Sequence, residues 1–122
     1  MENSHKDNIL SIIELAVLDS ISNDLEEIKE IYNLINHPQH YGWLKENKDK
    51  LITRSEIISA LKLLHQKGYV MYYETENDEK GNPFLQKKEV PLSVVTNFEE
   101  CFFEPTVEGR AIWEIMIDQY TQ

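Results

Sequence analysis

Hydrophobic positions along the chain form helical and strand-like stretches separated by short polar breaks. Lys6 to Ser20 is apolar around nearly its whole circumference, which is typical of a helix buried centrally or in a subunit interface. A second helical stripe runs from Leu25 to Ile35, preceded by Asn23 and Glu26 at capping-box spacing. It should end at His37, because the residue before a proline disfavours helical geometry.

The clearest helix is predicted from Arg54 to Lys67. Thr53 and Glu56 form a capping box at its start, and Gly68 should cap its end in the left-handed region. Its inner stripe is Ile57, Ile58, Leu61 and Leu64, and its outer stripe is Ser55, Ser59, Lys62 and Gln66. Between the second helix and this one, residues 37–52 hold Tyr41, Trp43 and Leu44, so we expect an insert anchored on the core, with a short helix near Gly42 to Asn47.

The second half of the chain favours strands and one closing helix. Tyr69 to Tyr73 is rich in β-formers, and the polar Glu74 to Asn82 predicts an exposed loop. Pro83 to Val95 is ambiguous strand material, because Pro91 restricts it to an edge or a break. Phe98 to Phe103 predicts a strand, and Pro105-Thr106 should start a last helix with Thr106 as its cap.

Two motifs in this order resemble those of winged helix-turn-helix regulators, most closely the PadR-like and MarR-like groups. The first is LLHQKGYV at Leu63 to Val70, and the second is FEPTVEGR at Phe103 to Arg110. The resemblance implies an α+β winged helix-turn-helix, mainly helical, with a small antiparallel ribbon and an additional C-terminal helix. It implies one domain over residues 1–122, with its core at about 7–117, the insert at 37–52 and the wing at 69–103.

The family role implies a DNA-binding transcriptional regulator. The helix predicted from Arg54 to Lys67 would be the third helix of this fold and would lie in the major groove. Wing lysines such as Lys80 would lie near phosphates. The candidate DNA-binding residues are Arg54, Ser55, Ser59, Lys62, Gln66, Lys87 and Lys88. We also expect a homodimer through the first and last helices.

Charge opens an alternative to this role. The formal net charge is −10, and Lys45 to Lys67 is the only region with an excess of bases. DNA affinity depends on neutralising several phosphates with Lys and Arg, which an acidic protein does poorly. The alternative is an acidic winged-helix interaction module, antitoxin-like, immunity-like or an adaptor, that binds a basic protein and not DNA.

Other candidate chemistry is weak. His37 and His40 lack the further ligands of a zinc site, and Cys101 lies among phenylalanines as a small buried hydrophobe. The acids Glu99, Glu100 and Glu104 are better explained as a solvated strand edge than as acid–base catalysts. We therefore expect no enzyme activity, metal or cofactor.

Aromatic residues leave one further alternative open. Trp43, Trp113, Tyr32 and Tyr120 could line a small-ligand pocket with the first helix, although plain core or dimer packing is favoured. No apolar run approaches the ~20 residues of a membrane span, and no export signal is recognisable. A cytoplasmic protein without a membrane partner is the expectation.

Overall fold

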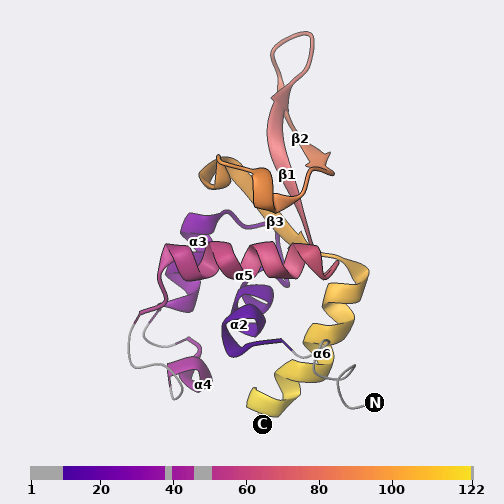
Figure 1. Ribbon diagram of the computed structural model, residues 1–122. Helices are drawn as coiled ribbons and strands as arrows, with labels where there is room; N and C mark the ends of the chain where they lie inside the picture. The colour runs from indigo at the N-terminus through magenta and orange to yellow at the C-terminus, as the bar shows by residue number, and fades with distance from the viewer. Residues whose placement is uncertain (1–9, 38–39, 46–50, 122) are drawn as a thin grey trace.

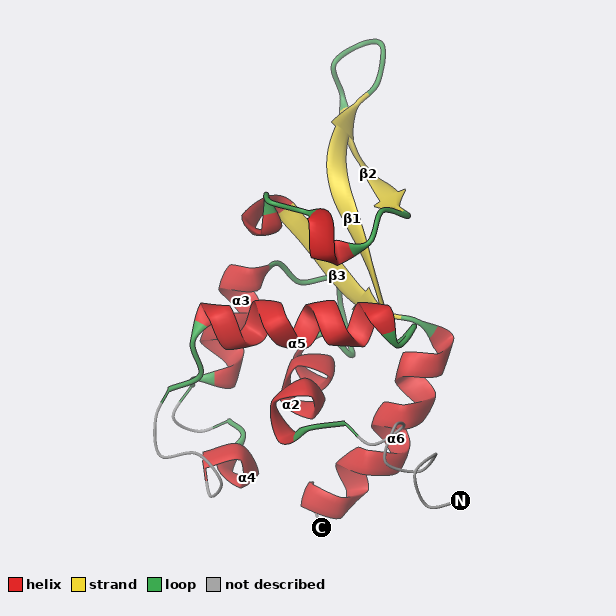
Figure 2. Cartoon of the chain, viewed as in Figure 1, coloured by secondary structure: helices red, strands yellow, loops and turns green. Residues whose placement is uncertain are grey.

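The computed structural model describes residues 10–37, 40–45 and 51–121. These residues form five α-helices and a three-stranded antiparallel sheet of order β2-β1-β3 (Figure 1; Figure 2). The helices are α2 (Ile12–Ser20), α3 (Ile28–Ile35), α4 (Gly42–Lys45), α5 (Arg54–Gln66) and α6 (Val107–Thr121). The strands are β1 (Val70–Asn77), β2 (Pro83–Lys88) and β3 (Cys101–Pro105), with 3-10 turns η1 (Leu92–Val94) and η2 (Phe98–Glu100). The predicted α+β class is confirmed.

Helix α2 begins later than the sequence pattern suggested. Its N-cap is Ser11, whose hydroxyl accepts from the Glu14 amide while the Glu14 carboxylate accepts from the Ser11 amide. This reciprocal cap makes Ile12 the first helical residue, so a helix that is continuous from Lys6 is wrong at residues 10 and 11; positions 6–9 lie outside the described residues. Leu15 to Leu18 have no exposed surface within the single chain, so α2 is a central core helix.

Helix α3 begins at Ile28, which corrects the predicted capping box of Asn23 and Glu26. The Glu26 amide donates to the Phe103 carbonyl at 3.1 Å, and the Phe103 amide donates back to the Glu26 carbonyl at 2.9 Å. This bridge to β3 holds Glu26 in an extended conformation. Tertiary pairing therefore wins over a local cap that is worth only about 1 kcal/mol.

Helix α5 follows the prediction closely. The Thr53 hydroxyl accepts from the Glu56 amide, and the Glu56 carboxylate accepts from the Thr53 amide. At the other end Gly68 has φ +83°, and the amides of Gly68 and Tyr69 donate to the carbonyls of His65 and Leu64. These two bonds form a Schellman motif, which ends the helix and directs the chain into β1.

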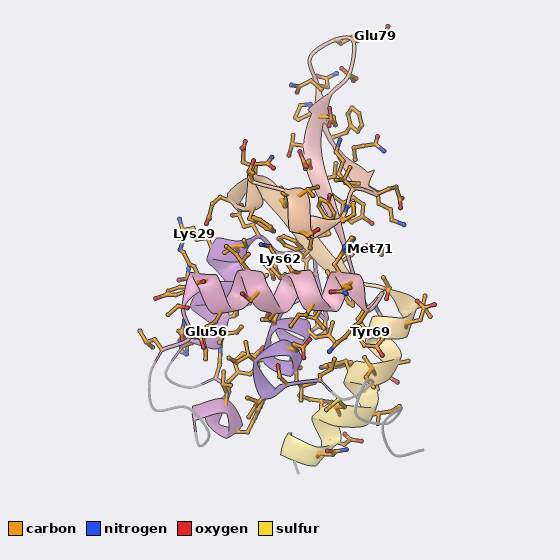
Figure 3. The ribbon with its side chains drawn as sticks, viewed as in Figure 1. Lys29, Glu56, Lys62, Tyr69, Met71 and Glu79 are labelled. Atoms are coloured by element: carbon orange, nitrogen blue, oxygen red, sulfur yellow. The ribbon has the colours of Figure 1, made fainter. Side chains whose placement is uncertain are left out.

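The β1–β2 hairpin projects beyond the helical body, with Glu79 at its tip (Figure 1; Figure 3). The predicted loop of Glu74 to Asn82 is wrong in its first half, because Glu74 to Asn77 pair with β2. A strand with neither face buried needs no alternation of apolar and polar residues. The polar residues 74–77 therefore look like a loop in the sequence. Of the ambiguous Pro83 to Val95, only Pro83 to Lys88 is strand.

The predicted strand from Phe98 is also shorter than expected. Residues 98–100 form η2, and β3 begins at Cys101. Strand β3 then pairs with β1 on the edge opposite β2.

The two sequence motifs meet in space at the start of α6. The Thr106 hydroxyl donates to the Gly68 carbonyl at 2.6 Å and accepts from the Gly109 amide at 3.0 Å, so Thr106 is the predicted cap. The Thr106 amide donates to the Tyr69 carbonyl at 3.0 Å. At Gly109 an added Cβ would lie 2.0 Å from the Tyr69 carbonyl oxygen, so this close approach requires glycine.

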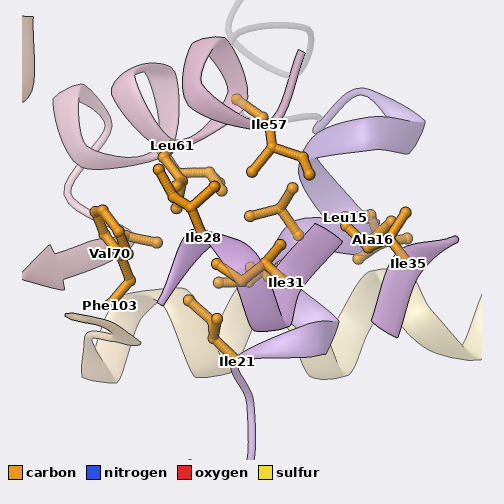
Figure 4. Packing of buried hydrophobic residues seen from close by; sticks show 14 of the residues in the cluster. Leu15, Ala16, Ile21, Ile28, Ile31, Ile35, Ile57, Leu61, Val70 and Phe103 are labelled. Atoms are coloured by element: carbon orange, nitrogen blue, oxygen red, sulfur yellow. The ribbon is translucent and has the colours of Figure 1, made fainter. Parts of the chain in front are cut away.

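The core lies between α2, α3, α5 and the sheet (Figure 4). Leu15 of α2, Ile31 of α3, Leu61 of α5 and Phe103 of β3 meet there, each without exposed surface. In the insert, Leu44 is 2% exposed and anchors α4 against this core. Among the described residues, no helix combines the length and the apolar character needed to cross a membrane.

Candidate interaction surface on helix α5

Helix α5 is fixed in place by its buried stripe and by a polar clamp before its first turn. Ile57, Leu61 and Leu64 have no exposed surface. The Asn36 side chain, at the end of α3, donates to the Ile52 carbonyl at 2.9 Å and accepts from the Ile52 amide at 2.8 Å. This pair replaces the missing backbone partners of Ile52, so the chain enters α5 in a defined position.

The centre of the outer face of α5 is exposed and uncharged. Ser55, Ser59 and Gln66 are exposed as predicted, and Leu63, which the sequence pattern did not place there, is 47% exposed. A shallow groove of about 240 Å³ runs along this face, between Ser55, Ser59 and Leu63 of α5 and Ile13 of α2. The acids Glu14 and Glu56 also line it. The described residues of the insert leave Ser55 and Ser59 open to solvent.

Arg54, the arginine of α5, is engaged within the chain. Its guanidinium donates to the Glu99 carboxylate at 2.6 Å and lies 6.0 Å from the centre of the Tyr32 ring. Both partners of the ion pair are about half exposed, at 50% and 54% of their side-chain surface. An exposed pair of this kind contributes little stability. The Glu99 carboxylate nevertheless neutralises the positive charge of Arg54, which a bound phosphate would need.

Lys62 is half-buried and also contacts another part of the chain. Its ammonium lies 5.4 Å from the centre of the Phe98 ring, between α5 and the segment that follows β2 (Figure 3). That segment, residues 89–100, is called the connector below. It is held on α5 by Leu92, which is 1% exposed, and on β1 by the Tyr72 hydroxyl, which donates to the Val90 carbonyl at 2.6 Å.

The connector and the end of α5 enclose a cleft of about 310 Å³ lined by Lys62, His65, Gln66 and residues 91–93. The His65 ring meets the Tyr72 ring edge-on, with centroids 5.4 Å apart. Burial lowers the pKa of His65, and the Glu89 charge opposes this only in part. His65 therefore belongs to the packing of α5 on the sheet.

The wing lysines carry their own counter-charges. Lys88 donates to the Glu76 carboxylate at 2.6 Å, and this hydrogen bond raises the pKa of Lys88. Lys87 lies 3.8 Å from the Glu89 carboxylate. Lys80 is exposed at the hairpin tip beside the acids Asp78 and Glu79, so the wing as a whole is not positive.

A cleft of about 310 Å³ near the start of α3 gathers acids from separate elements. Glu27, Glu74, Glu99 and Glu100 all line it. Nearby, the pKa of Glu26 is raised, first by burial and then by its acidic neighbours. Negative charge therefore lies directly beside the N-terminal half of α5.

The seven candidate residues are thus brought to two places. Arg54, Ser55, Ser59, Lys62 and Gln66 share α5, while Lys87 and Lys88 lie on β2 of the hairpin. The sequence reasoning missed the connector, whose Phe98 and Glu99 engage the α5 cations. Pro91 was a signal for the break there, but nothing local indicates which helix the connector contacts.

The remaining candidates for catalysis have structural explanations. Cys101 is fully buried, its thiol donates weakly to the Asn97 carbonyl, and burial raises its pKa to about 11. It is the small buried hydrophobe that the sequence predicted. His37 and His40 stack with ring centroids 4.3 Å apart, and no metal-ligating group of three or more His, Cys, Asp or Glu exists among residues 10–37, 40–45 and 51–121.

Comparison with models of known protein families gave no match, and comparison with curated proteins gave none either.

Proposed function

We propose that the chain is a winged-helix domain that binds a protein partner through the exposed face of α5. The observation that carries this proposal is that the cations on and near α5 and on β2 already contact acidic or aromatic groups of the same chain. Arg54, Lys67 and Lys88 lie within 3 Å of carboxylates, and Lys62 lies over an aromatic ring. A surface that binds phosphates needs such cations free.

Binding DNA through this face would break these contacts and bring acids close to phosphates. Arg54 would have to leave Glu99, and Glu100 lies next to it. A contact between a protein cation and a phosphate gains free energy because it releases counterions from the nucleic acid. A cation that is already paired within the protein loses most of that gain. The acids around α5 therefore argue against a nucleic-acid partner.

The same face suits a protein surface. Its central residues, Ser55, Ser59 and Leu63, are uncharged, and Leu63 offers an apolar contact that is 47% exposed. Protein interfaces combine such an apolar centre with a polar rim. The formal charge of −10 favours a basic partner, because it speeds and orients the encounter.

The order of the elements supports the winged-helix assignment. Helix α2, the bridge at Glu26, helices α3 and α5, and the β1–β2 hairpin follow one another in the winged-helix order, with α4 inserted and α6 added. The fold by itself does not select the partner, since one fold hosts many functions.

Affinity capture from cells that make the protein tests the proposal. A specific partner should be retained by the wild-type chain and lost with Leu63→Asp. Ile115→Asp on α6 is the matched control, since Ile115 is also exposed, at 63%, and should keep the partner. A partner that binds both variants equally would show that α5 is not the binding face.

Sequence-specific DNA binding is the second candidate. It is favoured by the polar Ser55 and Ser59 in the N-terminal half of α5 and by the projecting hairpin (Figure 1). In that case the chain binds mixed duplex DNA at about 50 mM salt, with affinity falling steeply as salt rises. Glu99→Gln should then strengthen binding by releasing Arg54, and Arg54→Ala should weaken it. Absence of binding by both wild type and Glu99→Gln excludes this candidate.

A further inference from the structure

A second surface, away from the α5 groove, combines aromatic rings with a carboxylate that pairs with none of the cations in the described part of the chain. It is a pocket of about 500 Å³ between the end of α2, the residues around α4, and α6. Asp19, Tyr41, Trp43 and Trp113 line it, with Glu26 and His40 also contributing. Small-molecule sites fall in this range of volume, lined by apolar walls and a few fixed polar groups.

The Asp19 carboxylate is held in place by neutral donors. The Trp113 indole donates to it at 2.7 Å, and the Tyr41 hydroxyl is hydrogen-bonded to it. Burial, and then the negative charge of Asp19, raise the pKa of Tyr41, so the phenol keeps its proton and remains a donor. None of the ion pairs among the described residues includes Asp19. Its charge is therefore fixed in position, and no cation of the described residues forms an ion pair with it.

The aromatic rings beside this carboxylate come from two distant parts of the sequence, Tyr41 and Trp43 around α4 and Trp113 in α6. The Tyr41 and Trp43 rings meet edge-on, with centroids 5.5 Å apart and planes at 76°. Tyr41 adopts φ +55°, a left-handed conformation that costs free energy for any residue but glycine and so requires support from its surroundings. The Asp19 bond provides part of that support, and it orients the phenol toward the carboxylate.

We propose that this pocket binds an organic cation, an ammonium group carried on a small apolar body. Aromatic faces attract cations through their quadrupole, and a nearby carboxylate adds a direct charge–charge attraction. An anion would meet Asp19 and Glu26, and a neutral apolar ligand would cover the half-buried Asp19 carboxylate without supplying a positive charge. The cation is the ligand class that satisfies both the rings and the carboxylate.

Intrinsic fluorescence tests this proposal directly, because both tryptophans of the chain line the pocket. Titration with benzyltrimethylammonium should change the emission saturably, with a dissociation constant of about 1 mM or lower. The neutral isostere, in which carbon replaces the ammonium nitrogen, should give no saturable change in the same range. The pair of ligands differs in charge alone, so the comparison needs no variant to fold.

A variant then assigns the site. Asp19→Asn should weaken binding of the cation by roughly tenfold or more, because it removes the charge but retains an oxygen acceptor. Asp118→Asn, at an exposed position of α6 outside the pocket, is the matched control and should bind as wild type does. Equal response to the cation and its isostere, no saturable response to the cation, or unchanged affinity in a folded Asp19→Asn variant each overturns the proposal.

Discussion

The substitution Gly109→Ala should change the free energy of unfolding through two effects of opposite sign, helix propensity and steric overlap. Gly109 lies in the first turn of α6, where replacing glycine with alanine normally stabilises a helix by up to about 1 kcal/mol. Here the new Cβ would lie 2.0 Å from the Tyr69 carbonyl oxygen and 2.9 Å from the Tyr69 carbonyl carbon. These are backbone atoms, so no side-chain rotation can relieve the overlap.

The expected cost follows from the contacts that would have to move. Cβ contacts under 3.0 Å essentially do not occur, so α6 and Tyr69 must separate by roughly 1 Å. The same carbonyl accepts from the Thr106 amide at 3.0 Å, and Thr106 also donates to Gly68 at 2.6 Å, so the separation strains both bonds. Overpacking costs about 1–3 kcal/mol and a strained hydrogen bond about 1 kcal/mol, against a propensity gain of about 1 kcal/mol. We expect a net loss of about 2 kcal/mol.

Urea unfolding followed by circular dichroism and tryptophan fluorescence measures this loss. The midpoint should fall with little change in slope, and Tm should fall by roughly 6–10 °C. Gly42→Ala is the control, since nothing lies within 4 Å of an added Cβ there. It should change the free energy of unfolding by no more than about 0.5 kcal/mol.

A Gly109→Ala variant as stable as wild type, or more stable, would refute the reasoning. It would mean that α6 moves away from Tyr69 at no cost. The contact between the two sequence motifs would then not be a fixed part of the fold.

Three further outcomes follow from single contacts. Lys67→Met should lower the free energy of unfolding, measured in urea, by roughly 2 kcal/mol, because it leaves the Glu14 carboxylate, 5% exposed, without its partner at 2.9 Å. Adding Glu14→Gln should recover part of this loss, and no recovery would contradict the ion-pair explanation. Asn36→Ala should cost about 2 kcal/mol by removing two bonds to the Ile52 backbone, and a loss under about 0.5 kcal/mol would show that the clamp is dispensable. Burial lowers the folded-state pKa of His65 below 6.5, so the unfolded state binds more protons; stability should fall as pH drops below about 6.5, and His65→Gln should flatten this part of the pH profile measured by urea unfolding.

Local signals were sufficient wherever a short stretch of sequence closes its own hydrogen bonds. The Thr53–Glu56 box, the inner stripe of α5 and the Gly68 turn are all present as the sequence predicted. Each involves residues within seven positions of one another, so the residue types alone define the geometry.

Local signals failed where a distant segment supplies the partner. Glu26 looks like part of a helix cap but pairs with Phe103, and the polar Glu74 to Asn77 form strand because β2 lies beside them. The closing helix was correct, but its tight packing on Tyr69 shows only in three dimensions.

The candidate site divides in the same way. The sequence identified α5 and its exposed Ser55 and Ser59, since helical spacing fixes which residues share a face. It could not show that Glu99 and Phe98 would engage Arg54 and Lys62, because those contacts depend on how the connector packs on α5.

By itself, then, the sequence determined which segments are helical, the caps of α5 and α6, and the α+β class, because these depend on residues that are neighbours along the chain. Tertiary structure alone decided which charges are free and which are paired, and it brought Asp19, Tyr41 and Trp113 together. The physical reason is that charge compensation acts across a few ångströms of space. Arg54 and Glu99, like Lys67 and Glu14, are separated by tens of residues of chain, which no local pattern records.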